Sequence, residues 1–145
     1  TIYGDGKQVR DILYVDDLIR AYELAIEQID VTRGRAYNVG GGPKNAISIW
    51  ADFSRVAADL LERDLPVDYG PWRPGDQKVY VSDIRKAERD FGWAPRISAA
   101  EGIARLFNWI TSNPALFEER LADAESVAAQ PMADLMPVVG GARRP

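Results

Sequence analysis

The sequence predicts an α/β protein, because two kinds of segment alternate along it. Extended runs rich in β-branched and aromatic residues, such as residues 8–15 and 78–81, predict strands. Between them, apolar residues recur every three or four positions, which predicts helices with one buried side. Stretches containing glycine and proline separate the two kinds of segment. We therefore expect short strands covered by helices.

The beginning of the chain predicts an extended segment, a tight turn, a strand and a helix. Gly4 and Gly6 favour the turn because glycine adopts backbone angles that are closed to other residues. The helix is expected from about Asp17, with Asp16 or Asp17 accepting hydrogen bonds from its first N–H groups. Its inward side should carry Leu18, Ala21, Tyr22, Ala25 and Ile29.

The middle of the chain predicts short strands around one more helix. A strand is expected at residues 35–39, where a glycine-rich turn ends it, and a smaller one at residues 67–69. Residues 70–77 are expected to form an irregular loop that contains two prolines. Ser48 is the expected N-cap of the helix between these strands. The buried stripe of that helix should be Ile49, Phe53, Val56, Ala57, Leu60 and Leu61.

Two further helices follow. The first is expected to begin at Ser82 or Asp83 and to end at Gly92, a common residue just past a helix. The second begins with a capping box, in which Ser98 and Glu101 satisfy each other's backbone donors. The residues expected to face inward on these helices are Ile84, Ala87, Phe91, Ile103, Leu106, Phe107 and Ile110.

The four tryptophans are expected to have different roles. Trp50 and Trp109 lie on expected helices and should be part of the core. Trp93 should fix the end of the helix before it. Trp72 lies in the irregular loop and is the tryptophan best placed to contact a ligand.

Residues 1–129 are expected to form one domain. A last helix should begin at Asn113–Pro114, with proline in its first turn, and carry Phe117, Leu121 and Val127. Residues 130–145 are rich in alanine, proline and glycine, and we expect a flexible tail there.

Composition excludes several classes of function. Of the 145 residues, 46% are apolar and 28% are charged, as in an ordinary soluble domain. The net charge is 18 − 22 = −4, so a nucleic-acid-binding surface, which needs a basic face, is not expected. The absence of cysteine and histidine excludes disulfides, a Ser-His-Asp triad and the usual zinc sites. We expect no bound metal.

The sequence has no apolar run of the roughly 18 residues that a membrane span needs, and no signal sequence. A cytoplasmic protein that does not bind membranes is the expectation. Because the chain begins at Thr1 within a motif, we also expect an N-terminal truncation.

Two arginines in turns are candidates for binding an anion. Arg10 leaves the first long strand beside the glycine turn, and Arg73 lies in the loop Pro-Trp-Arg-Pro-Gly-Asp-Gln. A planar guanidinium group matches two phosphate oxygens at once, so two such groups can hold one diphosphate if the fold brings them together. Taken alone, each arginine is more often a surface charge or the partner of a nearby carboxylate, here Asp11 or Asp76.

Several short motifs follow one another in a characteristic order, at residues 4–11, 15–17, 38–41, 73–76, 82–86 and 92–95. In this order they resemble the C-terminal part of the NAD-dependent nucleotide-sugar epimerases and dehydratases, the extended short-chain dehydrogenase/reductase family. Residues 40–48 and 75–83 are most similar to the CDP-paratose (tyvelose) 2-epimerase branch. The resemblance implies the last strand–helix units of a Rossmann-like parallel sheet, together with the small C-terminal substrate-binding lobe.

The resemblance also implies the residues that hold a nucleotide-diphosphate sugar. Arg10 and Arg73 match the pair that binds the diphosphate, and Asp76 matches an acid near the ribose, although it could instead orient Arg73. Thr1 and Tyr3 match the segment that touches the base, largely through its backbone. Residues near enough in sequence to contact the ligand are Gln8, Trp72 and Tyr80, and those that could contact the cofactor are Tyr37 and Asn38. The alternatives are a core position for Tyr3 and a water-facing position for Gln8.

For the intact enzyme, the resemblance implies tightly held NAD that takes a hydride from a sugar carbon while a tyrosine takes the hydroxyl proton. The keto intermediate is then reduced from its other face. In such a division of labour the cofactor supplies the redox chemistry and the protein anchors the nucleotide. The binding energy of the nucleotide can then help to position the reacting sugar carbon.

This chain departs from that pattern, because two motifs are missing. Gly40, Gly41 and Gly42 are followed by Pro43 and not by the helix of a dinucleotide fingerprint. Tyr3 and the lysine four residues later have the spacing of a catalytic Tyr-x-x-x-Lys couple, but the glycines between them oppose a helix. We therefore assign no catalytic residue and expect the chain alone to be inactive and to hold NAD poorly.

Two alternatives remain open. The intact protein could be a dehydratase or reductase of the same family, such as a dTDP-glucose 4,6-dehydratase. The chain could also be a stand-alone, non-catalytic module that binds sugar nucleotides. A homodimer is possible in either case.

Overall fold

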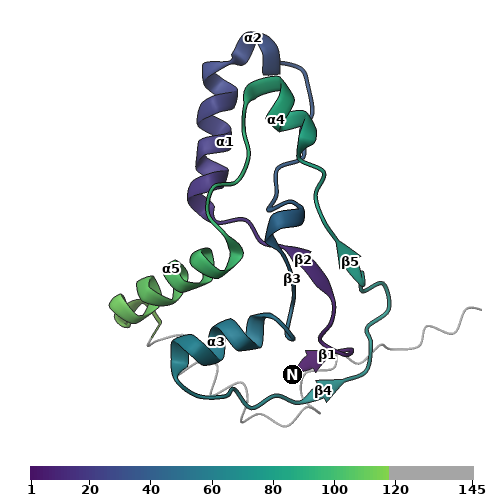
Figure 1. The fold of residues 1–145 in the computed structure, drawn as a ribbon, viewed down its shortest axis with the longest axis vertical. Helices are drawn as coiled ribbons and strands as arrows, with labels where there is room; N and C mark the ends of the chain where they lie inside the picture. The colour runs from purple at the N-terminus through teal and green to yellow at the C-terminus, as the bar shows by residue number, and fades with distance from the viewer. Residues whose placement is uncertain (118–145) are drawn as a thin grey trace, which may run out of the picture. The chain divides into compact units, whose positions relative to one another are not determined.

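The computed structural model describes residues 1–117. The chain divides into two compact units, the first spanning Thr1–Asn108 and the second beginning at Trp109. Figure 1 shows the first unit as short strands and helices joined by long connections. Every residue predicted to bind a ligand belongs to the first unit.

Two small sheets position the N-terminal segment. Strand β1 (Ile2–Tyr3) pairs in parallel with β4 (Tyr69–Gly70). Strand β2 (Val9–Asp11) lies at the centre of a three-stranded sheet with the order β3-β2-β5. It pairs antiparallel with β3 (Ala46–Ser48) and parallel with β5 (Val79–Tyr80). The parallel pairs join residues about 70 positions apart, so the loop before β5 is held against the N-terminus.

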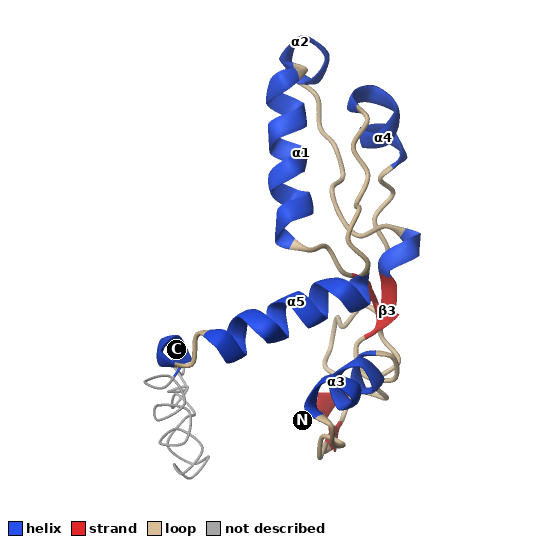
Figure 2. Cartoon of the chain, turned by 60° about the vertical axis from the view of Figure 1, so that its left-hand side comes forward, coloured by secondary structure: helices blue, strands red, loops and turns tan. Residues whose placement is uncertain are grey.

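Helices lie between groups of these strands along the chain, and Figure 2 shows the helices in blue. Their bounds are α1 Val15–Glu27, α2 Ile29–Thr32, the short 3₁₀ helix η1 Pro43–Asn45, α3 Phe53–Leu61, α4 Arg85–Phe91 and α5 Ala99–Ser112. Strand and helix alternation confirms the α/β class. Three predicted features are also confirmed. They are the extended segment before Gly4, the short strand before Ser82 and the helix end at Gly92, whose φ is 69°.

The main core lies between α1 and α4. Ala21, Ala87, Phe91 and Trp93 form a buried cluster. The partly buried side chains around it are Leu13, Leu24, Ala25, Tyr37, Val39 and Ile84. The indole N–H of Trp93 donates to the Asp17 carbonyl at 2.9 Å, so this tryptophan connects the end of α4 to α1, as predicted.

The predicted role of Asp16 or Asp17 as a helix cap is wrong. Helix α1 begins at Val15, and its N-cap Tyr14 makes no side-chain capping bond. The carboxylate of Asp17 is buried and accepts hydrogen bonds from the backbone N–H groups of Arg96 and Ile97, both at 2.9 Å. Asp17 therefore holds the chain after α4 against α1. Helix α1 thus starts two residues earlier than expected, and β2 ends at Asp11.

Two predicted elements of the middle region are also wrong. Residues 35–39 are extended but form no strand, because no neighbouring strand pairs with them in the part of the chain that the structure describes. The strand β3 lies instead at residues 46–48, which pair with β2. Ser48 is thus not the N-cap, which is Asp52. The Ser48 hydroxyl still accepts a bond from the N–H of Asp52 at 2.7 Å and fixes the turn before α3.

Several apolar residues expected to face inward are exposed. They include Tyr22, which is 64% exposed, and Ile29, which is 53% exposed. Leu106 and Trp109 on α5 are also about half exposed, at 52% and 50%. Helical spacing identified apolar stripes correctly, but it could not tell which stripe meets the core. The predicted Ser98 cap is confirmed by a bond from the N–H of Glu101 at 3.2 Å.

The predictions for Leu121, Val127 and the tail at residues 130–145 lie outside the described residues.

The first turn of α4 carries a strong ion pair, and we predict that one substitution removes its effect on the pKa of Asp83. The Arg85 guanidinium donates to both Asp83 carboxylate oxygens, at 2.8 and 2.6 Å, and lowers the pKa of that carboxyl from 3.8 to about 2. Arg85→Ala should return this pKa towards 3.8 in an NMR titration of the side-chain carboxyl carbon. Arg89→Ala, which removes another exposed arginine of α4, should leave it unchanged.

The sign of the linked stability effect follows from the lowered pKa. The ion pair stabilises the folded chain fully above about pH 3.8, and its contribution is lost as the pH falls towards 2. An unchanged pKa of Asp83 in the Arg85 variant would contradict the assignment of the shift to this pair.

Candidate functional site

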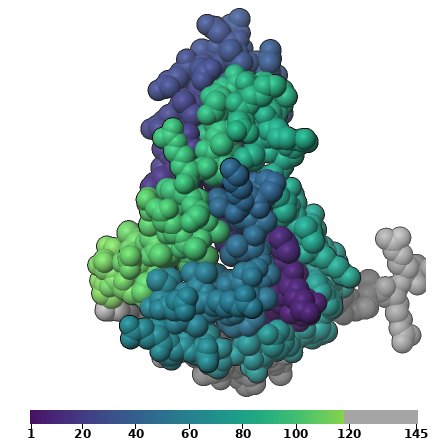
Figure 3. Space-filling model, in the orientation of Figure 1, coloured from purple at the N-terminus to yellow at the C-terminus, as the bar shows by residue number. Residues whose placement is uncertain are grey.

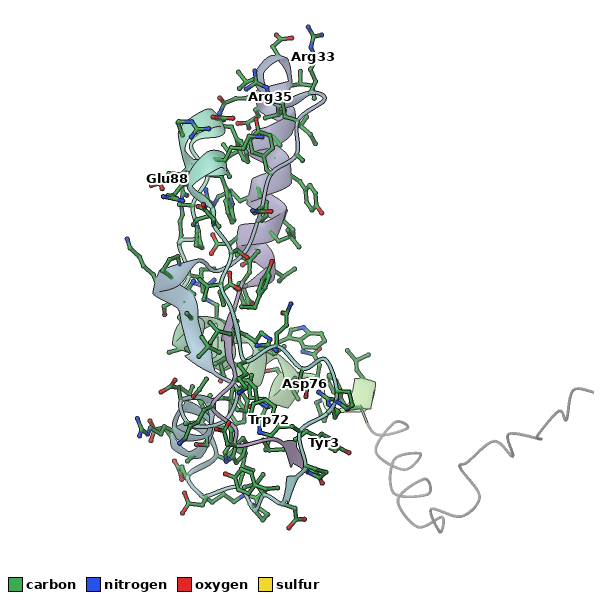
Figure 4. All side chains as sticks on the ribbon, turned by 90° about the vertical axis from the view of Figure 1, so that its right-hand side faces the viewer. Tyr3, Arg33, Arg35, Trp72, Asp76 and Glu88 are labelled. Carbon is green, nitrogen blue, oxygen red and sulfur yellow. The ribbon has the colours of Figure 1, made fainter. Side chains whose placement is uncertain are left out.

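The glycine turn after β1 is closely packed against the loop at residues 70–77. Gly4 has φ 86°, and a Cβ atom built on it would lie 2.8 Å from the indole ring of Trp72 and from the Gln8 amide nitrogen. Its N–H also donates to the Gly70 carbonyl at 3.0 Å. Only glycine satisfies both the backbone angle and the close approach. The turn therefore holds Trp72 against the N-terminal strand, and Figure 4 shows Tyr3, Trp72 and Asp76 close together.

Arg73 is oriented by two neighbours. Its Nε donates to an oxygen of Asp76 at 3.1 Å, and its guanidinium carbon lies 4.8 Å from the centre of the Tyr3 ring. The side chain of Arg73 is 62% exposed, whereas that of Asp76 is 20% exposed. The carboxylate and the aromatic ring thus fix the guanidinium in place while much of it faces solvent. The core position considered for Tyr3 is wrong, because this side chain is exposed.

Arg10 reaches the same loop from β2. Its guanidinium donates to the carbonyls of Val9 and Gln77, both at 2.7 Å. The two arginines, 63 positions apart (73 − 10), therefore bond to adjacent residues, Arg10 to Gln77 and Arg73 to Asp76. The parallel pairing of β2 with β5 produces this convergence. Binding of a phosphate by the pair stays a prediction.

Sequence reasoning missed a third cation beside this loop. The ammonium group of Lys78 lies 5.7 Å from the centre of the Trp72 ring, within the range of a cation–π contact. Lys78 looked only like the first residue of a strand, and no local pattern indicated that its side chain turns towards Trp72. Tyr80, on β5 opposite Arg10, is 49% exposed. Arg10 and Lys78 thus lie beside the loop that carries Arg73 and the exposed ring of Trp72.

Gln8 occupies a buried position between the turn and the sheet. It is 3% exposed, so the water-facing alternative is wrong. Its amide nitrogen donates to the Tyr3 carbonyl, while its Oε1 atom has no hydrogen-bond partner within the described residues. A buried acceptor without a donor is unfavourable by about 1–3 kcal/mol. Contact of Gln8 with the ligand stays a prediction.

The predicted cofactor-contacting residues lie in a different region. The Tyr37 ring packs edge-on against Phe91, with ring centres 5.0 Å apart, and its hydroxyl bonds to Asp90. The Asn38 amide donates to the Asp83 carbonyl. Tyr37 therefore lies against α4, and Asn38 lies beside Asp83 just before that helix; neither contacts the loop at residues 70–77 through the bonds that it makes. A contact with NAD stays a prediction for them.

The glycine-rich turn at residues 40–42 is packed against other parts of the chain. A Cβ atom on Gly40 would lie 2.2 Å from the Ser82 hydroxyl, and one on Gly41 would lie 2.2 Å from the Ile12 carbonyl. The space beside these glycines is occupied by other parts of the protein, and the turn leads into the three-residue helix η1. Tyr3 lies on β1 and not on a helix, so it does not share a helix face with the lysine four residues later. The absence of an NAD fingerprint and of a catalytic couple stays a prediction.

A cavity of about 520 Å³ lies elsewhere in the first unit. It is lined by residues of three segments, around η1, α4 and the chain after α4, including Lys44, Asn45, Ile84, Arg85 and Arg96. None of the predicted ligand-binding residues lines it. The candidate site is thus an exposed cluster of loop and strand residues, and Figure 3 shows the purple N-terminal residues at the surface against teal residues from the middle of the chain.

Two kinds of feature are absent from residues 1–117. No helix there is long and apolar enough to cross a membrane. The same residues contain no group of three or more acidic side chains that could hold a metal ion.

The packing of Gly4 leads to a stability prediction. Gly4→Ala should lower the free energy of unfolding by about 3 kcal/mol, from backbone strain and from the clash with Trp72. Gly75→Ala is the matched control, because Gly75 has φ 83° and open space around its Cβ position. This control should lose only about 1 kcal/mol, the strain alone. Equal losses in denaturant unfolding of the two variants would contradict the close packing at Gly4.

Known proteins match both the sequence and the fold. A sequence profile described as GDP-mannose 4,6 dehydratase matches residues 1–106. CDP-paratose 2-epimerase of Salmonella typhi is 37% identical over 112 residues, which cover 77% of this chain and 33% of that protein. dTDP-glucose 4,6-dehydratase of Escherichia coli is 32% identical over 123 residues, covering 77% and 33%.

Solved structures agree. UDP-glucuronic acid 4-epimerase from Bacillus cereus, in complex with UDP-glucuronic acid and NAD, is 30% identical and superposes with a TM-score of 0.69. The match covers 77% of this chain and 34% of that structure. A dTDP-glucose 4,6-dehydratase from Streptomyces venezuelae, with NAD bound, has a TM-score of 0.68 at 31% identity and covers 81% and 35%.

The proteins that this chain matches in sequence and fold are nucleotide-sugar epimerases and dehydratases of the NAD-dependent, Rossmann-like type. The chain belongs to the GDP-mannose 4,6 dehydratase family. It spans about a third of the length of the relatives it matches. The resemblance seen in the sequence motifs and the implied fold are thereby confirmed, and NAD is the cofactor in the solved structures of the family.

Proposed function

We propose that this chain is the nucleotide-sugar-binding portion of an NAD-dependent epimerase, and that Arg10 and Arg73 hold the diphosphate of the substrate. The observation that carries the proposal is the convergence of both guanidinium groups on adjacent residues of one loop. Solved relatives bind sugar nucleotides such as UDP-glucuronic acid, which contain a diphosphate. Two fixed guanidinium groups complement such a dianion through charge-assisted hydrogen bonds.

The neighbouring residues suit the rest of a nucleotide. The exposed rings of Tyr3, Trp72 and Tyr80 provide flat apolar surface for a base or ribose. When a phosphate of the ligand binds Arg73 in place of Asp76, the Asp76 carboxylate can accept a hydrogen bond from a ribose hydroxyl. The backbone of Thr1 and Tyr3 borders the same region, and Gln8 lies next to it. Lys78 adds positive charge beside Trp72.

We assign NAD and the reacting groups to polypeptide that corresponds to the rest of the relatives' length. On this proposal the chain alone neither holds NAD tightly nor catalyses a reaction. A cytoplasmic location and a homodimer of the intact enzyme belong to the same proposal. Turnover of a CDP-, dTDP- or UDP-sugar by this chain with NAD alone would contradict the proposed division.

CDP-paratose 2-epimerase activity is the particular reaction that we propose for the intact protein. The relative from Salmonella typhi supports it with 37% identity. A 4,6-dehydratase is the second candidate, supported by the description of the family profile and by relatives at 32–34% identity. Incubating the full-length protein with NAD and either CDP-tyvelose or dTDP-glucose separates the two, because one product is an epimer and the other has lost water.

A further inference from the structure

The carboxylate of Asp11, at the end of β2, holds two segments that lie far from it in the sequence. Its Oδ2 atom accepts hydrogen bonds from the backbone N–H groups of Gly42, at 2.9 Å, and Ser82, at 3.1 Å. Gly42 immediately precedes η1 and β3, and Ser82 follows the end of β5 by two residues. Strands β3 and β5 are the two neighbours of β2, which Figure 1 shows between them. One oxygen atom thus connects the end of β2 to segments next to both of its neighbours.

The contact between Asp11 and these segments is closely packed. A Cβ atom built on Gly40 would lie 2.7 Å from Oδ2 of Asp11, so the backbone of the glycine turn approaches the carboxylate as closely as glycine allows. Hydrogen bonds from backbone N–H groups to an ionised carboxylate are charge-assisted and strong. Asp11 is half-buried, which limits the competition of water for these bonds.

The position of Arg10 depends on the same strand that Asp11 holds. The Gln77 carbonyl, to which Arg10 donates, comes two residues before β5, whereas Ser82 comes two residues after it. The ladder between β2 and β5 is only two residue pairs long. Strand β5 is therefore fixed by Arg10 at one end and by Asp11 at the other. The guanidinium has further N–H groups besides the two that donate to carbonyls, and these are available to a ligand.

We infer that Asp11 is a positioning residue for the diphosphate site, which acts through β5 to hold Arg10 in the orientation that receives the ligand. Loss of the bond from Ser82 frees the far end of β5. The Gln77 carbonyl that orients the guanidinium then shifts with the strand, and the N–H groups directed at the ligand shift with it. Asp11 has this role only if Arg10 binds a diphosphate, so the role rests on the proposed function.

The charge of Asp11 makes this role testable by the direction of an effect. A carboxylate next to an anion-binding cation repels the anion, so its removal should strengthen binding if charge alone mattered. A positioning role predicts weaker binding, because a displaced guanidinium loses charge-assisted bonds to the ligand. The direction of the change in affinity therefore separates the two effects.

The test is isothermal titration of the full-length protein with CDP, UDP and dTDP. For the nucleotide that binds most tightly, Asp11→Asn, which removes the charge but keeps the shape, should weaken binding about fivefold. Asp11→Ala, which also removes the acceptor, should weaken it about tenfold. Asp5→Asn is the matched control, because Asp5 accepts a backbone N–H bond from Lys7 at 3.0 Å that spans only two positions. This control should bind as tightly as the unchanged protein, or slightly more tightly.

A double-mutant cycle tests whether Asp11 acts through Arg10. In the Arg10→Ala background, Asp11→Asn should weaken binding by less than about twofold, because the group that it positions is no longer present. Hydrogen exchange at the Ser82 amide, which should become faster in both Asp11 variants, checks that the bond to the carboxylate is lost. Circular dichroism checks that the variants keep their helices.

Three results would overturn the positioning role. The first is unchanged or tighter binding by both Asp11 variants, and the second is an equal loss with Asp5→Asn. The third is a loss in the Arg10→Ala background as large as in the unchanged protein, since Asp11 would then act independently of Arg10. Failure of the unchanged protein to bind any of the three nucleotides would instead contradict the proposed function, and the positioning role with it.

Discussion

Trp93→Ala is expected to lower the free energy of unfolding of the chain by about 4 kcal/mol. Trp93 is fully buried and packs with Ala21, Ala87 and Phe91. Its removal leaves a large cavity and also leaves the Asp17 carbonyl without its indole donor. The measurement is equilibrium unfolding in urea followed by far-ultraviolet circular dichroism, which reports the loss of α1 and α4.

Trp93→Phe separates the two parts of this effect. Phenylalanine retains much of the buried apolar surface but cannot donate to Asp17, so the loss should be about 2 kcal/mol. Trp109→Ala removes an indole ring that is 50% exposed and should change the stability by less than about 1 kcal/mol. A loss below about 1 kcal/mol for Trp93→Ala would show that the core between α1 and α4 is not organised as described.

Arg10→Ala and Arg73→Ala are each expected to weaken the binding of a nucleotide-diphosphate sugar by about 30-fold. A hydrogen bond to a charged group contributes about 1.5–3 kcal/mol, and 1.4 kcal/mol corresponds to a factor of ten in affinity. The measurement is isothermal titration of the full-length protein with its sugar nucleotide. The double variant should lose less than the product of the two effects, because both groups face one ligand.

Controls separate binding from folding. Arg33→Ala removes an exposed arginine beyond α2, remote from Tyr3 and Trp72 in Figure 4, and should leave the affinity unchanged. Asp76→Asn retains the shape of the partner of Arg73 but not its charge, so it distinguishes orientation of the arginine from contact with the ribose. Unchanged affinity in both arginine variants would remove the assignment of the diphosphate site.

Local patterns predicted the elements that depend on short-range chemistry. Gly92 ends α4 because its φ is positive, and Ser98 caps α5 because its side-chain oxygen reaches a first-turn N–H. The spacing of apolar residues identified α1, α3, α4 and α5. The motif order indicated the family, and with it the pairing of distant arginines that no periodicity could suggest.

Long-range pairing explains the predictions that failed. Residues 35–39 have a strand pattern, but a strand requires a neighbour, and β2 pairs with residues 46–48 instead. Asp17 looked like a cap because it lies at a helix start, yet its acceptors are satisfied by Arg96 and Ile97, about 80 positions away. The position of Lys78 over Trp72 likewise depends on how the loop folds back on Gly4.

The most direct test of the central claim is a heteronuclear NMR titration of the chain with UDP, CDP and dTDP at about 1 mM. The account predicts saturable shifts of the Trp72 indole N–H and of the Arg10 and Arg73 Nε–H signals, while the buried Trp93 indole stays in place. Shifts confined to residues around the cavity at Lys44 and Arg96, or no shift at the two arginines with any of the three nucleotides, would contradict it.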